Sequence, residues 1–252
     1  MDGVNFVTSS LLLGVSGLAH GFGQRVAGPR ERAREVAGNF FMDSGEVCFL
    51  KQVHGCAVAT PPWTEPPEAD AAVTRDPGTL LAIETADCLP ILIVDPRKRL
   101  VAAAHAGWRG TVAGVAREIV RALVEWGSSP PRLLAALGPA IGPCCYEVGS
   151  DVEEAFGPAG SMFFVPGTAG RKHLDLVGAN RAQLQEAGLS PANIDGLDFC
   201  TRCREDLFFS YRRDGKSAGR MISVVGYSKQ GAALPVERGL RLAGAPEVPR
   251  RD

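Results

Sequence analysis

Three short apolar runs follow one another between residues 80 and 107, and they restrict the possible folds more than any other feature of the chain. They read "LLAIETADC", "LPILIVD" and "RLVAAAHAG". The segment "RDPG" precedes the first run and "DPRKR" joins the last two, and both are typical turn sequences. Apolar runs of this length between turns indicate buried β-strands. We therefore predict a buried sheet in which strands that are consecutive in the sequence lie side by side.

Further strands are expected on both sides of these runs. Residues 46–60, "EVCFLKQVHGCAVAT", are rich in β-branched and aromatic residues and indicate a strand, a break at Gly55 and a second strand. The proline-rich segment 60–70 is expected to be a loop, because proline cannot donate regularly to a β-ladder. Strands are also predicted near residues 132–137 and 220–227.

Two segments carry apolar residues at helical spacing. The first runs from residue 111 to about residue 126, with Thr111 as a suitable N-cap and Gly127 as the stop. The second runs from about residue 176 to 185 and is closed by Gly188. Strands and helices do not alternate regularly, so the pattern predicts an α+β fold rather than a doubly wound sheet.

The composition suits one larger domain. The chain has 252 residues, of which 45% are hydrophobic and 22% charged. No internal repeat and no clear linker divides it, so we expect a single domain over residues 1–252. The last residues, 243–252, are expected to form a frayed tail.

Charge and cysteine content exclude several kinds of partner. The net charge is −1 and no run of five lysines and arginines occurs, so nucleic acid is not an expected partner. The apolar stretch 9–23 is shorter than the roughly 20 residues of a membrane span and lacks a basic start, so we interpret it as a buried strand region. Seven cysteines, an odd number without a signal peptide, favour free thiols or metal ligands. We expect a cytoplasmic protein, monomeric or a small homo-oligomer, that does not bind membranes.

Three soft metal-ligand side chains stand at special places in this pattern. His54 lies just before the break at Gly55, Cys88 at a strand start and His105 at a strand end. One thiolate and two imidazoles suit zinc, and three protein ligands would leave the fourth tetrahedral position open for catalysis. Each residue could equally be a packed core residue, and the spacing matches no compact zinc motif.

A second group of cysteines competes for a metal. "CTRC" at 200–203 is a CxxC pair, and Cys144 with Cys145 could complete a four-thiolate structural site. Adjacent cysteines do not easily bind one ion, and the chain has no second CxxC pair. A redox CxxC normally opens a helix in a thioredoxin-like unit, which this context does not resemble. The sequence favours neither interpretation.

Two arginines are candidates for anion binding. If a helix begins near Thr111, its free N–H groups lie beside His105, with Arg109 in the same turn, and could hold a phosphate or carboxylate. A surface salt bridge is the alternative role for Arg109. In "FFSYRRDG" the two phenylalanine rings are expected to face the core, and Arg212 and Arg213 would point in opposite directions if the segment is extended. One of these two could face a pocket.

Six motifs occur in a fixed order and resemble those of the laccase-domain family, also described as multicopper polyphenol oxidase-like and more recently as purine nucleoside phosphorylases. The resemblance covers about residues 17–228. Its motifs are "KQVHG", "ADAAVT", "TADCLPILI", "AAAHAGWRGT", "GPAIGPCCYEVG" and "DFCTRCREDLFFSYRRDGKSAGR". It departs from the family near "HGFGQRVAGPRERAREV", which is shortened, so His20 and Arg25 in this segment are given no catalytic role.

The resemblance implies an α-β-β-α sandwich with mixed sheets, related to cysteine-dependent deamidase toxins. It also implies that His54, Cys88 and His105 form the metal and catalytic set, with zinc as the metal and copper as the alternative. The implied substrates are purine nucleosides and phosphate. The implied activity is phosphorolysis of adenosine, inosine and methylthioadenosine, together with deamination of adenosine.

Phosphorolysis needs a phosphate below the anomeric carbon, for which Arg109 is the candidate. Deamination needs an activated water and a proton shuttle, for which Asp87 is the candidate carboxylate, unless it only orients a ligand.

The alternative is an amide hydrolase acting on peptidoglycan precursors, with Cys88 as nucleophile and His105 as base. Copper-dependent phenol oxidation is disfavoured, because multicopper sites need about ten histidines and the chain has four. A binding module, with the three ligands serving structure only, is the remaining class.

Overall fold

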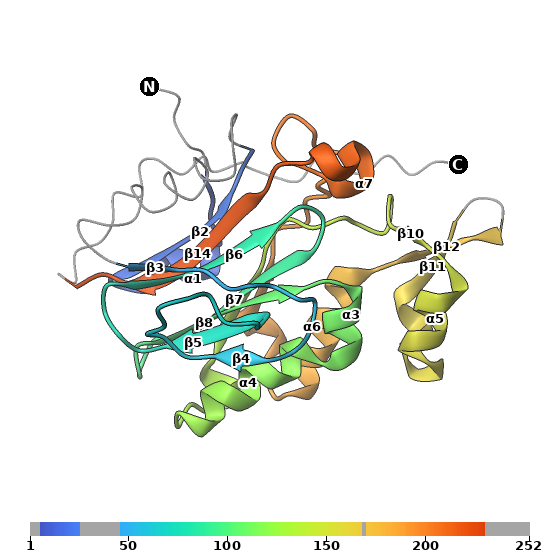
Figure 1. Cartoon of the computed structure of the whole chain (residues 1–252). Helices are drawn as coiled ribbons and strands as arrows, with labels where there is room; N and C mark the ends of the chain where they lie inside the picture. The colour runs from blue at the N-terminus through green and yellow to red at the C-terminus, as the bar shows by residue number, and fades with distance from the viewer. Residues whose placement is uncertain (1–5, 26–45, 168–169, 230–252) are drawn as a thin grey trace.

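Two mixed β-sheets pack face to face in the computed structural model, which describes residues 6–25, 46–167 and 170–229 (Figure 1). The first sheet has, in spatial order, β1 (Phe6–Val7), β2 (Leu18–Gly23), β14 (Met221–Tyr227), β6 (Thr79–Thr85) and β3 (Glu46–Cys48). The second has β13 (Ile194–Gly196), β9 (Leu134–Leu137), β7 (Leu89–Asp95), β8 (Leu100–Ala106), β5 (Ala71–Thr74) and β4 (Val58–Ala59).

The second sheet is buried on both faces, which explains its nearly continuous apolar strands. Successive side chains of a strand point to opposite faces. Leu92 and Val94 of β7 pack in the core between the two sheets, whereas Ile91 and Ile93 pack in the core under the helices. Every residue of β7 and β8 is buried.

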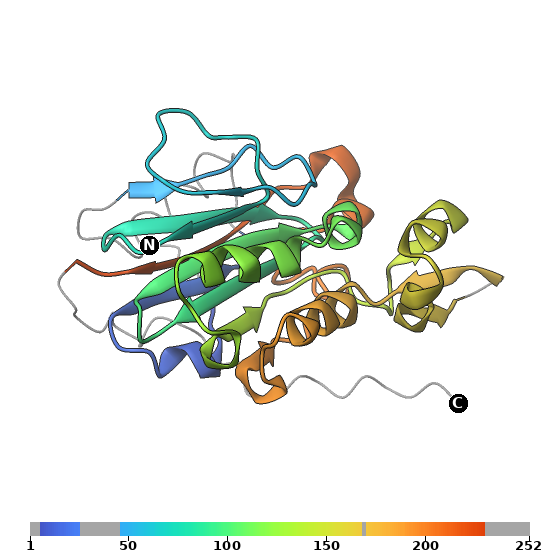
Figure 2. The ribbon, with the colours of Figure 1, turned by 90° about the horizontal axis from the view of Figure 1, so that it is seen from below.

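Two helices cover the outer face of this sheet. They are α4 (Val115–Glu125) and α6 (Leu176–Glu186), which lie side by side in front of the sheet in Figure 2. A short helix, α3 (Trp108–Ala113), connects β8 to α4. The described residues thus form a helical layer and two sheets, three of the four layers implied by the resemblance, and the α+β class with mixed sheets is confirmed.

The remaining elements are small. A three-stranded sheet with α5 (Ser150–Phe156) projects to one side and comprises β10 (Glu147–Val148), β12 (Lys172–Leu174) and β11 (Phe164–Pro166) (Figure 1). The short helices α1 (Ser10–Leu13) and α7 (Tyr211–Asp214) lie near opposite ends of the first sheet. Short 3₁₀ helices occupy Pro130–Arg132, Pro158–Phe163, Pro191–Asn193 and Gly215–Ser217. Within the described ranges, no helix has the length and apolar character needed to cross a bilayer.

The predicted neighbour relations hold for one pair of strands and fail for another. β7 and β8 are antiparallel neighbours, as expected. β6 and β7 are consecutive in the sequence but belong to different sheets, so that prediction was wrong. The chain turns from one sheet to the other within "TADC", where Asp87 has φ 90°, a value that side-chain-bearing residues rarely adopt. This crossover places Cys88 between the two sheets.

The first predicted helix begins earlier than expected and is interrupted. Gly107, not Thr111, is the N-cap, and Gly114 (φ 85°) ends α3 before α4 starts. The Thr111 hydroxyl donates instead to the Gly107 carbonyl and accepts from Asn180, so it is engaged inside the fold. Glycine supplies the left-handed conformation that lets the chain change direction between α3 and α4.

The second predicted helix is confirmed as α6, and the stretch 9–23 is corrected. Asp175 caps α6 by accepting from Gly178 N–H. Residues 9–23 form a helix before the strand, because the Ser9 hydroxyl caps Leu12 and starts α1. The segment 243–252 lies outside the described residues.

Candidate metal centre and substrate pocket

Two of the three candidate ligands lie where β7 and β8 pair. Cys88 directly precedes β7, and His105 is the penultimate residue of β8, opposite Pro90. The antiparallel register therefore brings the start of one strand to the end of the other. Cys88 and His105, 17 positions apart in the sequence, become neighbours through this pairing alone.

The third candidate, His54, is held by a buried carboxylate that the sequence analysis did not select. Asp70 lies immediately before β5 and is fully buried. Its two oxygens accept from the backbone N–H groups of three successive residues, at 3.1 Å, 2.9 Å and 2.6 Å: Val53, His54 and Gly55. These bonds fix the tight loop in which His54 has φ 63°. The signal was present in "ADAAVT", as an acidic residue at the start of an apolar strand.

The same carboxylate orients His105. Asp70 Oδ1 accepts from His105 Nδ1 at 2.7 Å, which leaves Nε2 directed at Cys88. Burial disfavours the charged imidazole, but hydrogen bonds and charge from Asp70 and Cys88 outweigh it and raise the pKa of His105 to about 9. Burial likewise opposes ionisation of Asp70, yet its pKa is lowered because His105 and Gly55 donate to it.

The Cys88 thiol, the one sulfur donor among these three residues, ionises more readily than an ordinary cysteine. Burial opposes its ionisation, but hydrogen bonds and positive charge from His105 and His54 outweigh it and lower the pKa of Cys88 to about 6. Without a metal, the pair is therefore a thiolate beside an imidazolium between these two pKa values.

One donor atom from each of the three residues lies within 4.8 Å of the other two. The rings of His54 and His105 meet edge to face, with their centroids 4.8 Å apart. A Cβ on Gly107 would lie 3.0 Å from Cys88 Sγ and 3.0 Å from His54 Cδ2, so a larger residue there would crowd the donors. The structure thus brings together all three residues that the sequence selected.

This group opens onto a pocket of about 950 Å³, which also contains the other selected side chains. Asp87, Arg109 and Arg212 all line it together with the three donors. The Arg109 guanidinium lies over the Trp108 ring, 4.3 Å from its centroid, and Arg212 lies 5.3 Å from the Tyr146 centroid. The volume is in the range of small-molecule sites.

The carboxylate of Asp87 is already engaged by its own chain. One oxygen accepts from Thr201 Oγ1 and the other from the backbone N–H of Arg212, both at 2.6 Å. Asp87 therefore ties the crossover between the sheets to the segments that carry Thr201 and Arg212.

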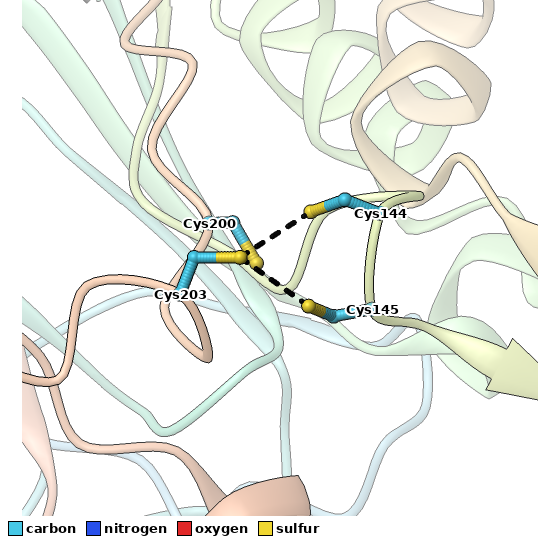
Figure 3. A group of neighbouring side chains, drawn as sticks. All are labelled: Cys144, Cys145, Cys200 and Cys203. Atoms are coloured by element: carbon cyan, nitrogen blue, oxygen red, sulfur yellow. Dashed lines mark hydrogen bonds between the residues drawn. The ribbon is translucent and has the colours of Figure 1, made fainter. Parts of the chain in front are cut away.

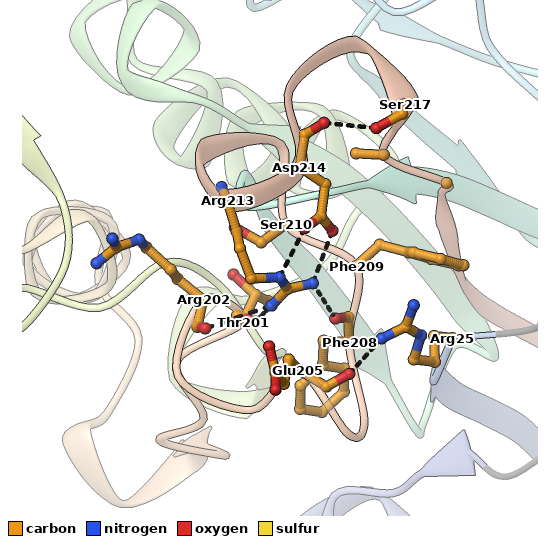
Figure 4. A network of polar contacts seen from close by, with 12 residues as sticks. Arg25, Thr201, Arg202, Glu205, Phe208, Phe209, Ser210, Arg213, Asp214 and Ser217 are labelled. Atoms are coloured by element: carbon orange, nitrogen blue, oxygen red, sulfur yellow. Dashed lines mark hydrogen bonds and ion pairs between the residues drawn. The ribbon is translucent and has the colours of Figure 1, made fainter.

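The segment "FFSYRRDG" turns into a helix rather than an extended strand. Ser210 caps α7, so Arg212 and Arg213 follow one another on a helical turn. Arg212 lines the pocket, whereas Arg213 pairs with Asp214 and donates to the carbonyls of Thr201 and Phe208 (Figure 4). The expectation that one of the two arginines faces a pocket is confirmed.

The two residues without an assigned role lie outside the pocket lining. His20 is buried on β2, where burial lowers its pKa to about 4 and its Nε2 accepts from Ser9 N–H. Arg25 donates to the Glu205 carbonyl and lies 4.9 Å from the Phe209 centroid (Figure 4).

The second cysteine group is also assembled by the fold, although the sequence did not favour it. Donor atoms of Cys144, Cys145, Cys200 and Cys203 all lie within 4.8 Å of one another. The sequence named this group as a possible four-thiolate site without favouring it, because the two pairs are separated by more than 50 residues and only the packing of two loops brings them together.

Comparison with known proteins gives one family and several relatives. Residues 19–228 match the family model described as "Multi-copper polyphenol oxidoreductase laccase". A protein from Deinococcus radiodurans named "Purine nucleoside phosphorylase" is 45% identical over 79% of this chain and 77% of its own. "Adenosine deaminase RL5", from an unknown prokaryotic organism, is 39% identical over 72% of this chain and 75% of its own. The crystal structure of YlmD from Geobacillus stearothermophilus superposes with a TM-score of 0.76 at 32% identity, covering 85% of this chain and 93% of that one.

Proposed function

The chain belongs to the multi-copper polyphenol oxidoreductase laccase family, whose relatives named above are enzymes, and on this premise we propose that it is a zinc-dependent purine nucleoside phosphorylase that also deaminates adenosine. One observation carries the proposal. The potential metal-ligand atoms of His54, Cys88 and His105 lie within 4.8 Å of one another and border a pocket of about 950 Å³. The names of the relatives support the substrate class. Adenosine, inosine and methylthioadenosine, each with phosphate, are the proposed substrates.

The donor set fits zinc. Two imidazoles and a thiolate are ligands that zinc accepts, and three protein ligands leave one tetrahedral position for water or substrate. The Asp70 carboxylate behind His105 is the kind of partner that fixes the tautomer of a ligating histidine. Zinc bound to His54, Cys88 and His105 would supply Lewis acidity and lower the pKa of a bound water, which deamination requires. The soft thiolate would also accept copper.

The two pocket arginines are proposed to hold phosphate. Arg109 and Arg212 are permanently charged and present planar donor groups that match phosphate oxygens. Stacking on Trp108 and Tyr146 restricts their guanidinium groups before substrate binds. Phosphate held between them would be positioned for attack on the sugar, which lowers the entropic part of the barrier.

Asp87 is proposed to support this phosphate site indirectly. Both of its oxygens accept hydrogen bonds from the chain, and one of these bonds fixes the backbone of Arg212. It therefore acts as a positioning residue rather than as a proton shuttle.

All seven cysteines are free, which supports a reducing compartment such as the cytoplasm.

The test is direct. Purified zinc-loaded protein is incubated with adenosine, inosine or methylthioadenosine, with and without phosphate. We expect free base and ribose 1-phosphate, or its methylthio analogue, only with phosphate, and inosine from adenosine in both cases. Cys88→Ala should abolish these products, whereas Cys48→Ala, which removes a buried thiol of β3 outside the pocket lining, should retain them. Absence of every product from the wild type would refute the function.

One observation favours a second candidate. Cys88, His105 and Asp70 form a continuous hydrogen-bonded chain, the arrangement of a thiol nucleophile, its base and the group that orients the base. This would be a Cys-His amide hydrolase acting without metal on peptidoglycan precursors. Amide cleavage that survives complete removal of zinc would support it, and strict dependence of all activity on zinc would exclude it.

A further inference from the structure

Four thiols meet at a second place in the fold, away from the three donors of the pocket. Cys144 and Cys145 lie on a turn after β9, and Cys200 and Cys203 lie on a loop before α7 (Figure 3). Cys203 Sγ lies 3.6 Å from Cys144 Sγ and 3.3 Å from Cys145 Sγ. We propose that these four cysteines bind a structural zinc ion as a closed four-thiolate site. This proposal does not rest on the nucleoside chemistry.

The distances between the sulfur atoms fit a tetrahedral ion better than a disulfide. Four sulfurs at about 2.3 Å from zinc lie about 3.8 Å from each other. All four atoms here lie within 4.8 Å of one another, and Cys203 Sγ lies 3.3 Å and 3.6 Å from two of the others. A disulfide would bring one pair to about 2.05 Å, and all four cysteines are free.

The local backbone overcomes the difficulty of two adjacent ligands. The N–H groups of Cys145 and Tyr146 both donate to the Gly142 carbonyl, at 2.9 Å and 3.0 Å, so the chain forms a tight turn. In this turn both thiols are directed at Cys203 (Figure 3). The CxxC side is also a turn, because Arg204 N–H donates to the Cys200 carbonyl.

Groups around the cluster would stabilise bound thiolates. Gly142 N–H donates to Cys200 Sγ at 3.3 Å, the kind of hydrogen bond that supports a metal ligand. Four thiolates and one divalent ion carry a net charge of −2, and the Arg202 guanidinium lies beside Cys145 to offset part of it. With four protein donors no position is left for substrate, so the site is structural.

The zinc ion would connect the two cysteine-bearing loops and so stabilise one side of the pocket. Ile141 and Tyr146 flank the Cys144–Cys145 turn and line the pocket. Thr201, between the other two cysteines, donates to Asp87, which holds Arg212. Cross-linking two loops that are more than 50 residues apart removes conformational freedom from the unfolded chain, and the bound ion itself stabilises the folded one.

The experiment counts and identifies metal in the full chain purified with zinc. We expect two zinc ions per wild-type chain, one in Cys88→Ala, one in Cys203→Ala and none in the double variant. Cys48→Ala is the matched control, because it removes a thiol outside both groups and should keep two ions. Cys88→Ala leaves the four-cysteine cluster intact, so a folding failure of Cys203→Ala does not prevent the test.

The ligands are read from the Cys88→Ala protein itself. X-ray absorption should show four sulfur atoms at about 2.3 Å from zinc, and cobalt substitution should give thiolate-to-metal charge-transfer bands. Loss of the ion should lower the thermal unfolding temperature. The proposal is overturned if folded Cys88→Ala binds no zinc, if its ion has nitrogen or oxygen ligands, or if the cluster is isolated as a disulfide. These outcomes leave the nucleoside assay unaffected, so the two proposals fail separately.

Discussion

Replacing Asp70 by asparagine is the sharpest test of how the metal centre is built. The carboxylate accepts four hydrogen bonds: from His105 Nδ1 and His54 N–H at one oxygen, and from Val53 and Gly55 N–H at the other. An asparagine amide has one acceptor and one donor group. If the NH₂ replaces Oδ2, it faces the N–H groups of Val53 and Gly55, and both lose their partner. If it replaces Oδ1, it faces the N–H of His54, which loses its partner, and the ring of His105.

The size of the effect follows from this count. A fully buried donor without a partner costs about 1–3 kcal/mol, and the backbone donors here are only partly buried, so losing one or two of these bonds lowers the free energy of unfolding by about 1–3 kcal/mol. If the NH₂ faces His105, the ring must also change tautomer and present N–H toward Cys88, where it cannot bind metal. Loss of such an orienting group weakens metal affinity about 10- to 100-fold.

The assay compares Asp70→Asn with Asp95→Asn. Asp95 is also fully buried, but only Oδ1 accepts, from Arg97 and Lys98 N–H, and Oδ2 has no hydrogen-bond partner. An amide can replace it without facing a donor. Urea unfolding of the zinc-free proteins and zinc competition with a chelator should therefore separate the two variants. If Asp70→Asn unfolds and binds zinc like Asp95→Asn, the orienting role of Asp70 is wrong.

Three further predictions concern the same region. At a pH between the pKa values of Cys88 and His105, Cys88 is already a thiolate and zinc must displace the proton of His105, so binding at this site should release about one proton there. The affinity for zinc should rise with pH up to about 9. The protons released at this site are counted as the difference between the wild type and Cys88→Ala. No release at neutral pH would contradict the pKa shifts. Gly107→Ala places a methyl group 3.0 Å from Cys88 Sγ and should weaken zinc binding measured by chelator competition. Unchanged affinity would show that the donor residues can move aside and that Gly107 is not needed for the site. Thr201→Val removes the 2.6 Å bond to the Asp87 carboxylate and should lower the free energy of unfolding by about 1.5–3 kcal/mol in urea, which an unchanged midpoint would rule out.

The local patterns of the sequence were sufficient for most elements and for the three donors. The strands β7, β8, β9 and β14 and the helix α6 follow from apolar periodicity and capping residues, which act over a few positions. Cys88 and His105 could be selected because they are potential metal ligands at strand ends, and His54 because it is a histidine directly before the break at Gly55. Asp70 was not selected, because a carboxylate before a strand is a weak signal that resembles an ordinary turn residue until its four donors are known.

Short-range signals misjudged the places where the chain changes direction. Thr111 has the chemistry of an N-cap, but the helix starts at Gly107, a position where a side chain would meet Cys88 and His54. β6 and β7 look like hairpin neighbours, yet the turn at Asp87 is stabilised by partners more than 100 residues away, Thr201 and Arg212. No local propensity contains that information.

The α+β class, the strands β7, β8, β9 and β14, the helix α6 and the three candidate ligands of the pocket could be predicted from the sequence, since these depend on periodicity and residue chemistry. Only the tertiary structure decided which sheet each strand joins, that Asp70 holds the ligands, and that four distant cysteines meet at one point. The physical reason is that these features depend on strand register and loop pairing between segments far apart in the chain.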